Sequence, residues 1–179
     1  MIGAVYGMLA SALIVGAAAT LLPLPRRQGV GWVVAGLALV TFAPFVHGAL
    51  GTPSFTLAQC ALLRLLAPQR PLLPGRLPAA LLVAGAAVFY PLALGLGPWD
   101  PFDLGYRPLP LLLALLPLGL WLAWRKEQLW LVVIGCNLLA YAAGLFDNFW
   151  NACCDPLLVI LAALRLLRSP QRETASPIN

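Results

Sequence analysis

Charged side chains are scarce in this chain of 179 residues: Asp, Glu, Lys and Arg make up 9% of it, whereas an average soluble domain has about 25%. Hydrophobic residues make up 61%. Such a chain has too few polar groups to cover a soluble core with a wetted surface. The composition therefore predicts an all-α, polytopic membrane protein, with one transmembrane helical domain over residues 1–169 and a short polar cytoplasmic tail over 170–179.

Histidine and lysine each occur once, which excludes two cofactors. His47 is the only histidine, so a haem held by two histidines of this chain is excluded. Lys126, the only lysine, lies between apolar runs, so retinal bound through a Schiff base is excluded as well. No acidic residue lies near the centre of an apolar run, which argues against a proton-coupled pump. Any other cofactor stays open.

Seven apolar stretches predict transmembrane helices at about 2–22, 30–50, 53–69, 78–99, 108–124, 129–149 and 152–168. A span needs about 20 apolar residues, and five of the stretches reach that length. The apolar runs within 53–69 and 152–168 are shorter. Both regions combine an N-cap residue with a proline, in Thr52-Pro53 and Asp155-Pro156, which favours a helix start there. The first stretch has no basic residue before it, so we interpret it as a retained helix rather than a cleaved leader.

The charges favour one orientation of these helices. Cytoplasmic loops are rich in Lys and Arg, and if all seven helices cross with the N-terminus outside and the C-terminus inside, every basic residue except Arg107 lies on the inner face. Four acidic residues then lie on the outer face: Asp100, Asp103, Asp147 and Asp155. We expect Arg64 and Arg165 of the short helices to extend to the inner headgroups. The basic residues fall singly or in pairs, so the net charge of +5 indicates topology and not nucleic-acid binding.

The two halves of the chain resemble each other weakly. The sequence RRQGVGWVV (26–34) is similar to RKEQLWLVV (125–133), and ALLRLLAPQR (61–70) is similar to AALRLLRSPQR (162–172). A 3+1+3 parallel internal repeat would explain this, with the helix at 78–99 joining two three-helix units. In transporter folds with such repeats, the site lies where the repeats meet. Chance convergence stays open, because Leu, Ala and Arg are frequent.

A polar stretch before the last helix is the first candidate site. Asp147, Asn151 and Asp155 would share one face if a helix continued through them, and with Asn148 they could hold a hard cation or receive a cationic solute. A metal, if there is one, would be held by Asp147 and Asp155. In the alternative interpretation, Asp155 caps the last helix, while Asp147 and Asn148 satisfy the last turn of the helix before it.

The turn-rich loop 95–110 extends this candidate site. It adds Asp100, Asp103 and Tyr106 on the same outer side, and His47 lies at the outer end of the second helix. If the loop folds over 147–155, these residues meet in one outer-facing pocket. The alternative for His47 is an interfacial residue hydrogen-bonded to a loop.

The cysteines do not suggest redox chemistry. Cys153 and Cys154 are neighbours, and a disulfide between neighbours is strained and differs from the C-x-x-C spacing of thiol oxidoreductases. Cys60 and Cys136 fall within predicted helices, where a lone cysteine behaves as a small hydrophobe.

Three functions remain open. The first, which we favour, is an accessory or assembly subunit that binds the lipid bilayer and another membrane protein. The second is a small solute transporter or facilitator with an outer-facing polar pocket. The third is a metal-dependent enzyme acting on a lipid-linked phosphate at the outer leaflet, although the absence of a catalytic motif argues against an enzyme. The Ala-, Leu- and Arg-rich composition indicates a bacterial inner membrane.

Overall fold

The computed structural model describes residues 2–41, 44–45, 48, 51–73 and 75–167. This part of the chain is helical and contains no strand, so the all-α prediction is confirmed for it. The helices are α1 (Ile2–Ala19), α2 (Arg27–Thr41), α4 (Phe55–Leu66), α5 (Arg76–Ala93), α6 (Pro101–Leu104), α7 (Pro108–Trp124), α8 (Gln128–Ala142), α9 (Phe149–Cys153) and α10 (Pro156–Leu167).

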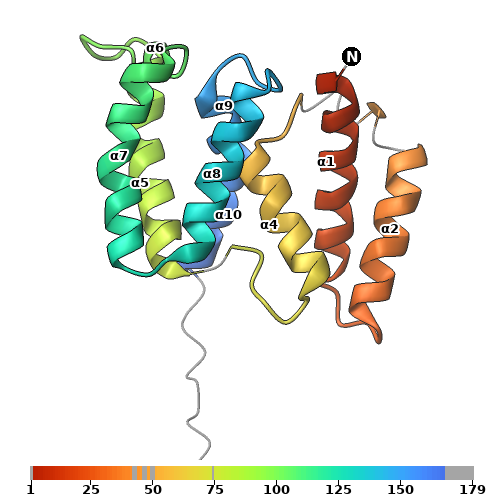
Figure 1. The fold of residues 1–179 in the computed structure, drawn as a ribbon. Coiled ribbons are helices and arrows are strands. Elements are labelled where there is room, and N and C mark those ends of the chain that lie inside the picture. The colour runs from red at the N-terminus through yellow and green to blue at the C-terminus, as the bar shows by residue number, and fades with distance from the viewer. Residues whose placement is uncertain (1, 42–43, 46–47, 49–50, 74, 168–179) are drawn as a thin grey trace, which may run out of the picture.

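The longer helices run alternately in opposite directions (Figure 1). The start of α1, the short helix α6 and the short helix α9 lie at one end of the bundle, and the α1–α2 and α7–α8 turns lie at the other. We call the first the acidic end, because its connecting segments contain Asp100, Asp103, Asp147 and Asp155. We call the second the basic end, because its connections and adjoining helix starts contain Arg26, Arg27, Arg70, Arg76, Arg125 and Lys126.

Within the part of the chain that the structure describes, two helices are long and apolar enough to cross a membrane: α1 and α5, each with 18 residues and with mean hydropathies of 1.9 and 1.5. The remaining apolar helices are shorter, and α4 and α10 have 12 residues each. Helix α8 ends at Ala142, seven residues before the predicted end of this stretch, and Gly144 then turns the chain with a φ of 72°. Asp147, Asn151 and Asp155 therefore do not lie on one continuous helix.

Small residues bring α1 and α2 together. A Cβ atom added to Gly16 would lie 2.6 Å from the Cβ of Ala35 and 2.6 Å from the carbonyl oxygen of Gly31. Close backbone approach at small residues is typical of helix pairs in membranes. On the other side of α4, the main apolar core joins five helices: α4, α5, α7, α8 and α10.

Helices α4 and α10 correspond at a constant spacing of 101 positions. Ser54 and Asp155 cap them, and 101 positions separate these two residues. The same spacing relates the buried Leu57 to the buried Leu158. It also relates two further pairs of residues, Ala61 with Ala162 and Arg64 with Arg165. The packing around the two helices differs, since α4 packs against α1 and α10 packs against α5.

Two expectations about the short helices need correction. The N-cap of α4 is Ser54 and not Thr52, because the Ser54 hydroxyl accepts the hydrogen bond from the N–H of Leu57. Arg64 does not extend outward from the bundle: the residue is 7% exposed and its side chain donates to the hydroxyl and the carbonyl oxygen of Thr20. Thr20 directly follows the last residue of α1, so Arg64 supplies a donor to a carbonyl group that the end of the helix leaves free.

Candidate functional site

The starts of α4 and α10 meet in a polar joint at the acidic end. One carboxylate oxygen of Asp155 accepts a hydrogen bond from the N–H of Leu158 (2.7 Å), which caps α10. The other accepts from the backbone N–H of Ser54 (2.8 Å), whose own side chain caps α4. Ser54 is fully buried. Asp155 thus uses both oxygens to hold two helix starts together.

Aromatic rings pack beside this joint. Tyr6 donates to the carbonyl oxygen of Pro53 (3.1 Å), next to Ser54 in the chain. The ring of Tyr6 lies 5.6 Å from that of Phe55 and 5.3 Å from that of Phe146, measured between centroids. These rings place apolar surface next to the polar joint, and hydrogen bonds in such surroundings are stronger than in water.

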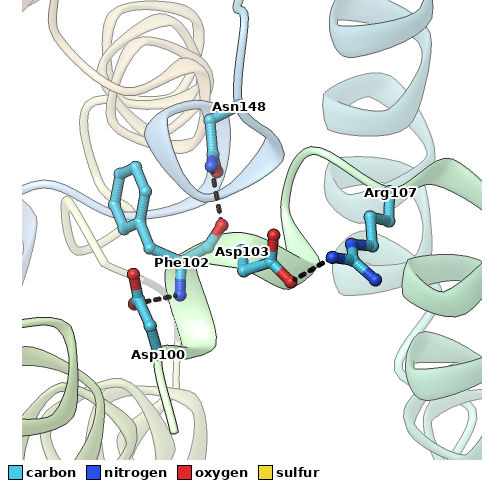
Figure 2. A network of polar contacts seen from close by, with 5 residues as sticks. All are labelled: Asp100, Phe102, Asp103, Arg107 and Asn148. Atoms are coloured by element: carbon cyan, nitrogen blue, oxygen red, sulfur yellow. Dashed lines mark hydrogen bonds and ion pairs between the residues drawn. The ribbon is translucent and has the colours of Figure 1, made fainter.

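The loop that contains α6 folds onto α9. We call residues 95–107 the α6 loop. Figure 2 shows the side-chain N–H of Asn148 donating to the carbonyl oxygen of Phe102 (2.9 Å). Trp150 donates from its indole to the carbonyl oxygen of Pro101 (3.0 Å), and the N–H of Phe149 donates to the carbonyl oxygen of Gly105 (3.1 Å). The α6 loop is therefore held to α9 by three hydrogen bonds.

The carboxylates of the α6 loop take no part in that contact (Figure 2). Asp100 accepts from the N–H of Phe102 (2.8 Å) and caps α6. Asp103 pairs with Arg107 (3.0 Å), with both side chains more than half exposed. The two acidic side chains are thus engaged within their own loop.

The remaining residues of the predicted outer cluster do not form one site. Asp147, Asn151 and Tyr106 are exposed, Asn148 is buried as the cap of α9, and His47 lies outside the described residues. Across the residues that the structure describes, no group of three or more His, Cys, Asp or Glu side chains is placed to hold a metal ion. The structure joins Asn148 to the α6 loop and Asp155 to Ser54, and it does not join the carboxylates to one another.

Cys153 and Cys154 lie between α8 and α10 as free thiols. The sulfur of Cys153 lies 3.5 Å from the amide nitrogen of Asn137, and that of Cys154 lies 3.9 Å from the hydroxyl of Tyr90. Both side chains are partly buried and each faces a neighbouring polar group, so their surroundings suit packing better than thiol exchange, which needs an accessible thiolate.

A buried amide network joins α4 to α8, and the sequence analysis missed it. Asn137 is 1% exposed. Its amide donates to the hydroxyl of Thr56 (2.7 Å), and its oxygen accepts from the amide of Gln59 (2.9 Å). The signal for it was present, since Gln59 and Asn137 are polar residues within two apolar helices. The partners stand 78 and 81 positions from Asn137, so the sequence did not pair them.

An apolar cleft of about 540 Å³ lies beside this network. Its walls come from α5, α7, α8, α9 and the α6 loop. Four of the chain's six tryptophans line it: Trp99, Trp121, Trp130 and Trp150. Phe89 and Phe149 line it as well. Thr56, Asn137, Cys153 and Cys154 form a narrow polar strip in the lining. The cleft thus offers apolar and aromatic surface beside an amide that is already hydrogen-bonded.

Comparisons with protein-family models, curated proteins and solved structures find no match. The functional argument therefore rests on the residues themselves. Two features are candidates for function: the polar joint with the adjacent α6 loop, and the apolar cleft. The groups of the first make helix caps and interhelix hydrogen bonds, and those of the second suit binding of an apolar guest.

Proposed function

We propose that this chain is a seven-span protein of the bacterial inner membrane, N-out and C-in, with a non-catalytic role as an accessory subunit of a larger membrane complex. The observation that carries the non-catalytic role is that two partly or fully buried polar side chains at the acidic end, Asp155 and Asn148, are engaged in holding helices. Asp155 joins the starts of α4 and α10, and Asn148 joins α9 to the α6 loop. Groups that hold helices in this way are not available to a substrate.

Charge supports the membrane topology. Because the helices alternate in direction, most arginines lie at one end of the bundle and most aspartates at the other. This agrees with the preference of cytoplasmic loops for Lys and Arg. The 12 residues of α4 and α10 cover about 18 Å at 1.5 Å per residue, less than the hydrocarbon thickness of about 30 Å. In this proposal the rings of Tyr6, Phe55 and Phe146 shield the buried caps where the short helices begin.

One face of α7 suits a protein partner. Leu113, Leu116, Leu120 and Trp124 are more than half exposed and recur at helical spacing on one side of the helix. The opposite side lines the cleft through residues such as Leu118 and Leu122. A second membrane protein packing on the outward leucines would complete the subunit assembly.

The test is assembly in mild detergent, with substitutions on two exposed surfaces. Wild type should purify with a partner at fixed stoichiometry, and the double variant Leu116→Trp, Leu120→Trp should lose it. Leu37→Trp on α2, at a position 62% exposed, is the matched control and should retain it. Recovery of wild type as a lone chain, or equal loss in both variants, would contradict the subunit proposal.

A facilitator is the second candidate, and the correspondence of α4 with α10 favours it. If the chain arose by duplication, the equivalent caps Ser54 and Asp155 meet where the two halves join. Such junctions form transport sites in repeat-built carriers. Purified protein alone should then move solute across the membrane of proteoliposomes. Solute movement no faster than in protein-free vesicles would remove this candidate.

A further inference from the structure

We propose that the cleft binds one apolar chain of an anionic phospholipid whose headgroup lies at the basic end. This inference rests on the proposed insertion in a membrane. It goes beyond the subunit role, because it assigns a ligand to a site that the assembly surface on α7 does not use.

The length of the cleft suits a lipid chain. Its lining follows α5 from Leu77 to Leu92, and this distance is about 22 Å at 1.5 Å per residue. That is most of the hydrocarbon thickness of about 30 Å. An elongated apolar cleft of about 540 Å³ therefore runs along the helices, in the direction in which lipid chains lie.

The cleft is accessible from the side of the bundle. Several lining residues are large, apolar and exposed, among them Leu81 (48%), Val88 (62%) and Leu118 (37%). They come from both α5 and α7, and α5 packs instead against α10 while α7 packs against α8. A chain of a neighbouring lipid can thus enter laterally, without leaving the hydrocarbon.

The polar strip favours an apolar guest over a polar one. The amide of Asn137 donates to Thr56 and its oxygen accepts from Gln59. Cys153 also faces this amide, at 3.5 Å. These groups are paired with one another, so an apolar chain lying over them leaves no new unsatisfied donor or acceptor, which would be costly in hydrocarbon.

The two ends of the cleft differ in charge and closure. At the acidic end the cleft is lined by the α6 loop, which is held by the hydrogen bond from Trp150 to Pro101. The negative charge of Asp100, next to Pro101 in the chain, disfavours a phosphate there. At the basic end, the lining residues Leu77 and Glu127 stand next to basic residues in the chain: Arg76, Arg125 and Lys126. They outnumber Glu127, and basic residues at a membrane surface attract anionic headgroups.

The experiment fills the cleft at a glycine that has space for a side chain. A Cβ added to Gly85, which lines the cleft, meets no heavy atom within 4 Å, and the same holds for Gly119 on α7, which does not line it. Full-length wild type, Gly85→Phe and Gly119→Phe would be purified from membranes in mild detergent and analysed by native mass spectrometry. We expect wild type and Gly119→Phe to retain one lipid, and Gly85→Phe to retain at least fivefold less.

Headgroup selectivity is tested in nanodiscs of equal phosphatidylglycerol and phosphatidylethanolamine. We expect wild type to retain mainly phosphatidylglycerol, and the double variant Arg125→Gln, Lys126→Gln to lose this preference at least threefold while still retaining a lipid.

Val88→Trp, at the exposed rim, replaces Gly85→Phe if the latter does not fold. Equal retention by filled and control variants would overturn the cleft as the site, and equal retention of the two lipids by wild type would overturn the anionic headgroup. Release of wild type from membranes by alkaline carbonate would instead overturn the proposed membrane insertion.

Discussion

The backbone N–H of Ser54 donates a 2.8 Å hydrogen bond to the carboxylate of Asp155, 101 positions further along the chain. Each of these residues also caps its own helix, α4 or α10. These two helices, with 12 residues each, therefore begin at a shared polar joint that fixes their positions relative to each other.

We predict that Asp155→Ala lowers the free energy of unfolding by about 2–3 kcal/mol, since it removes a cap and leaves the buried N–H of Ser54 without its acceptor. Asp147→Ala, at an exposed position of the same end, is the control and should change it by less than about 0.5 kcal/mol. Unfolding by SDS in mixed micelles measures both. Equal stability of the two variants would show that the joint contributes nothing.

We predict that Gly105→Ala detaches the α6 loop from α9. A Cβ atom at position 105 would lie 2.1 Å from the side-chain oxygen of Asn148 and 2.6 Å from the ring of Trp150. Hydrogen exchange should therefore rise at Phe149, whose N–H donates to Gly105 in the native contact. Gly85→Ala meets no neighbouring atom and should leave exchange there unchanged. Unchanged exchange in both variants would contradict the observed packing.

The corresponding arginines Arg64 and Arg165 should differ in their contribution to stability. Arg64 donates to Thr20 through two nitrogens and to the carbonyl oxygen of Arg70, and hydrogen bonds to charged groups contribute about 1.5–3 kcal/mol. Arg64→Met should therefore lower the free energy of unfolding by about 2–4 kcal/mol. The buried Nε of Arg165 has no hydrogen-bond partner in the described part of the chain, so Arg165→Met should cost less than about 1 kcal/mol. SDS titration of the two variants side by side tests this, and a larger loss for Arg165→Met would reverse the assignment.

We predict that the acidic and basic ends lie on opposite sides of the membrane. Gln69 lies in the α4–α5 connection and Leu96 in the α6 loop, and both are exposed. Single cysteines at these positions, in a chain whose four cysteines are replaced by alanine, should react with an impermeant thiol reagent in intact cells only at position 96. Both should react in permeabilised cells. Labelling of both positions in intact cells would overturn the topology.

The helical class of the described residues was predictable from composition and apolar runs: 9% charged residues and long apolar stretches predict membrane spans, and a span in a bilayer satisfies its backbone groups most simply as a helix. The helix starts were less certain: Pro156 marks the start of α10, as expected, whereas α4 begins after Ser54 and not after Thr52. Both candidates are good caps, and the choice between them depends on which of them meets Asp155.

The sequence by itself determined the all-helical class of the described residues and the separation of arginines from aspartates along the chain, because both depend on residues that are neighbours in the sequence. Only the tertiary structure decided that Asp155 binds Ser54, that Arg64 is buried against Thr20, and that Asn137 meets Gln59 and Thr56 beside an apolar cleft. These contacts join residues between 44 and 101 positions apart. A polar side chain in an apolar helix shows that it needs a partner, but which partner it finds depends on how the helices pack.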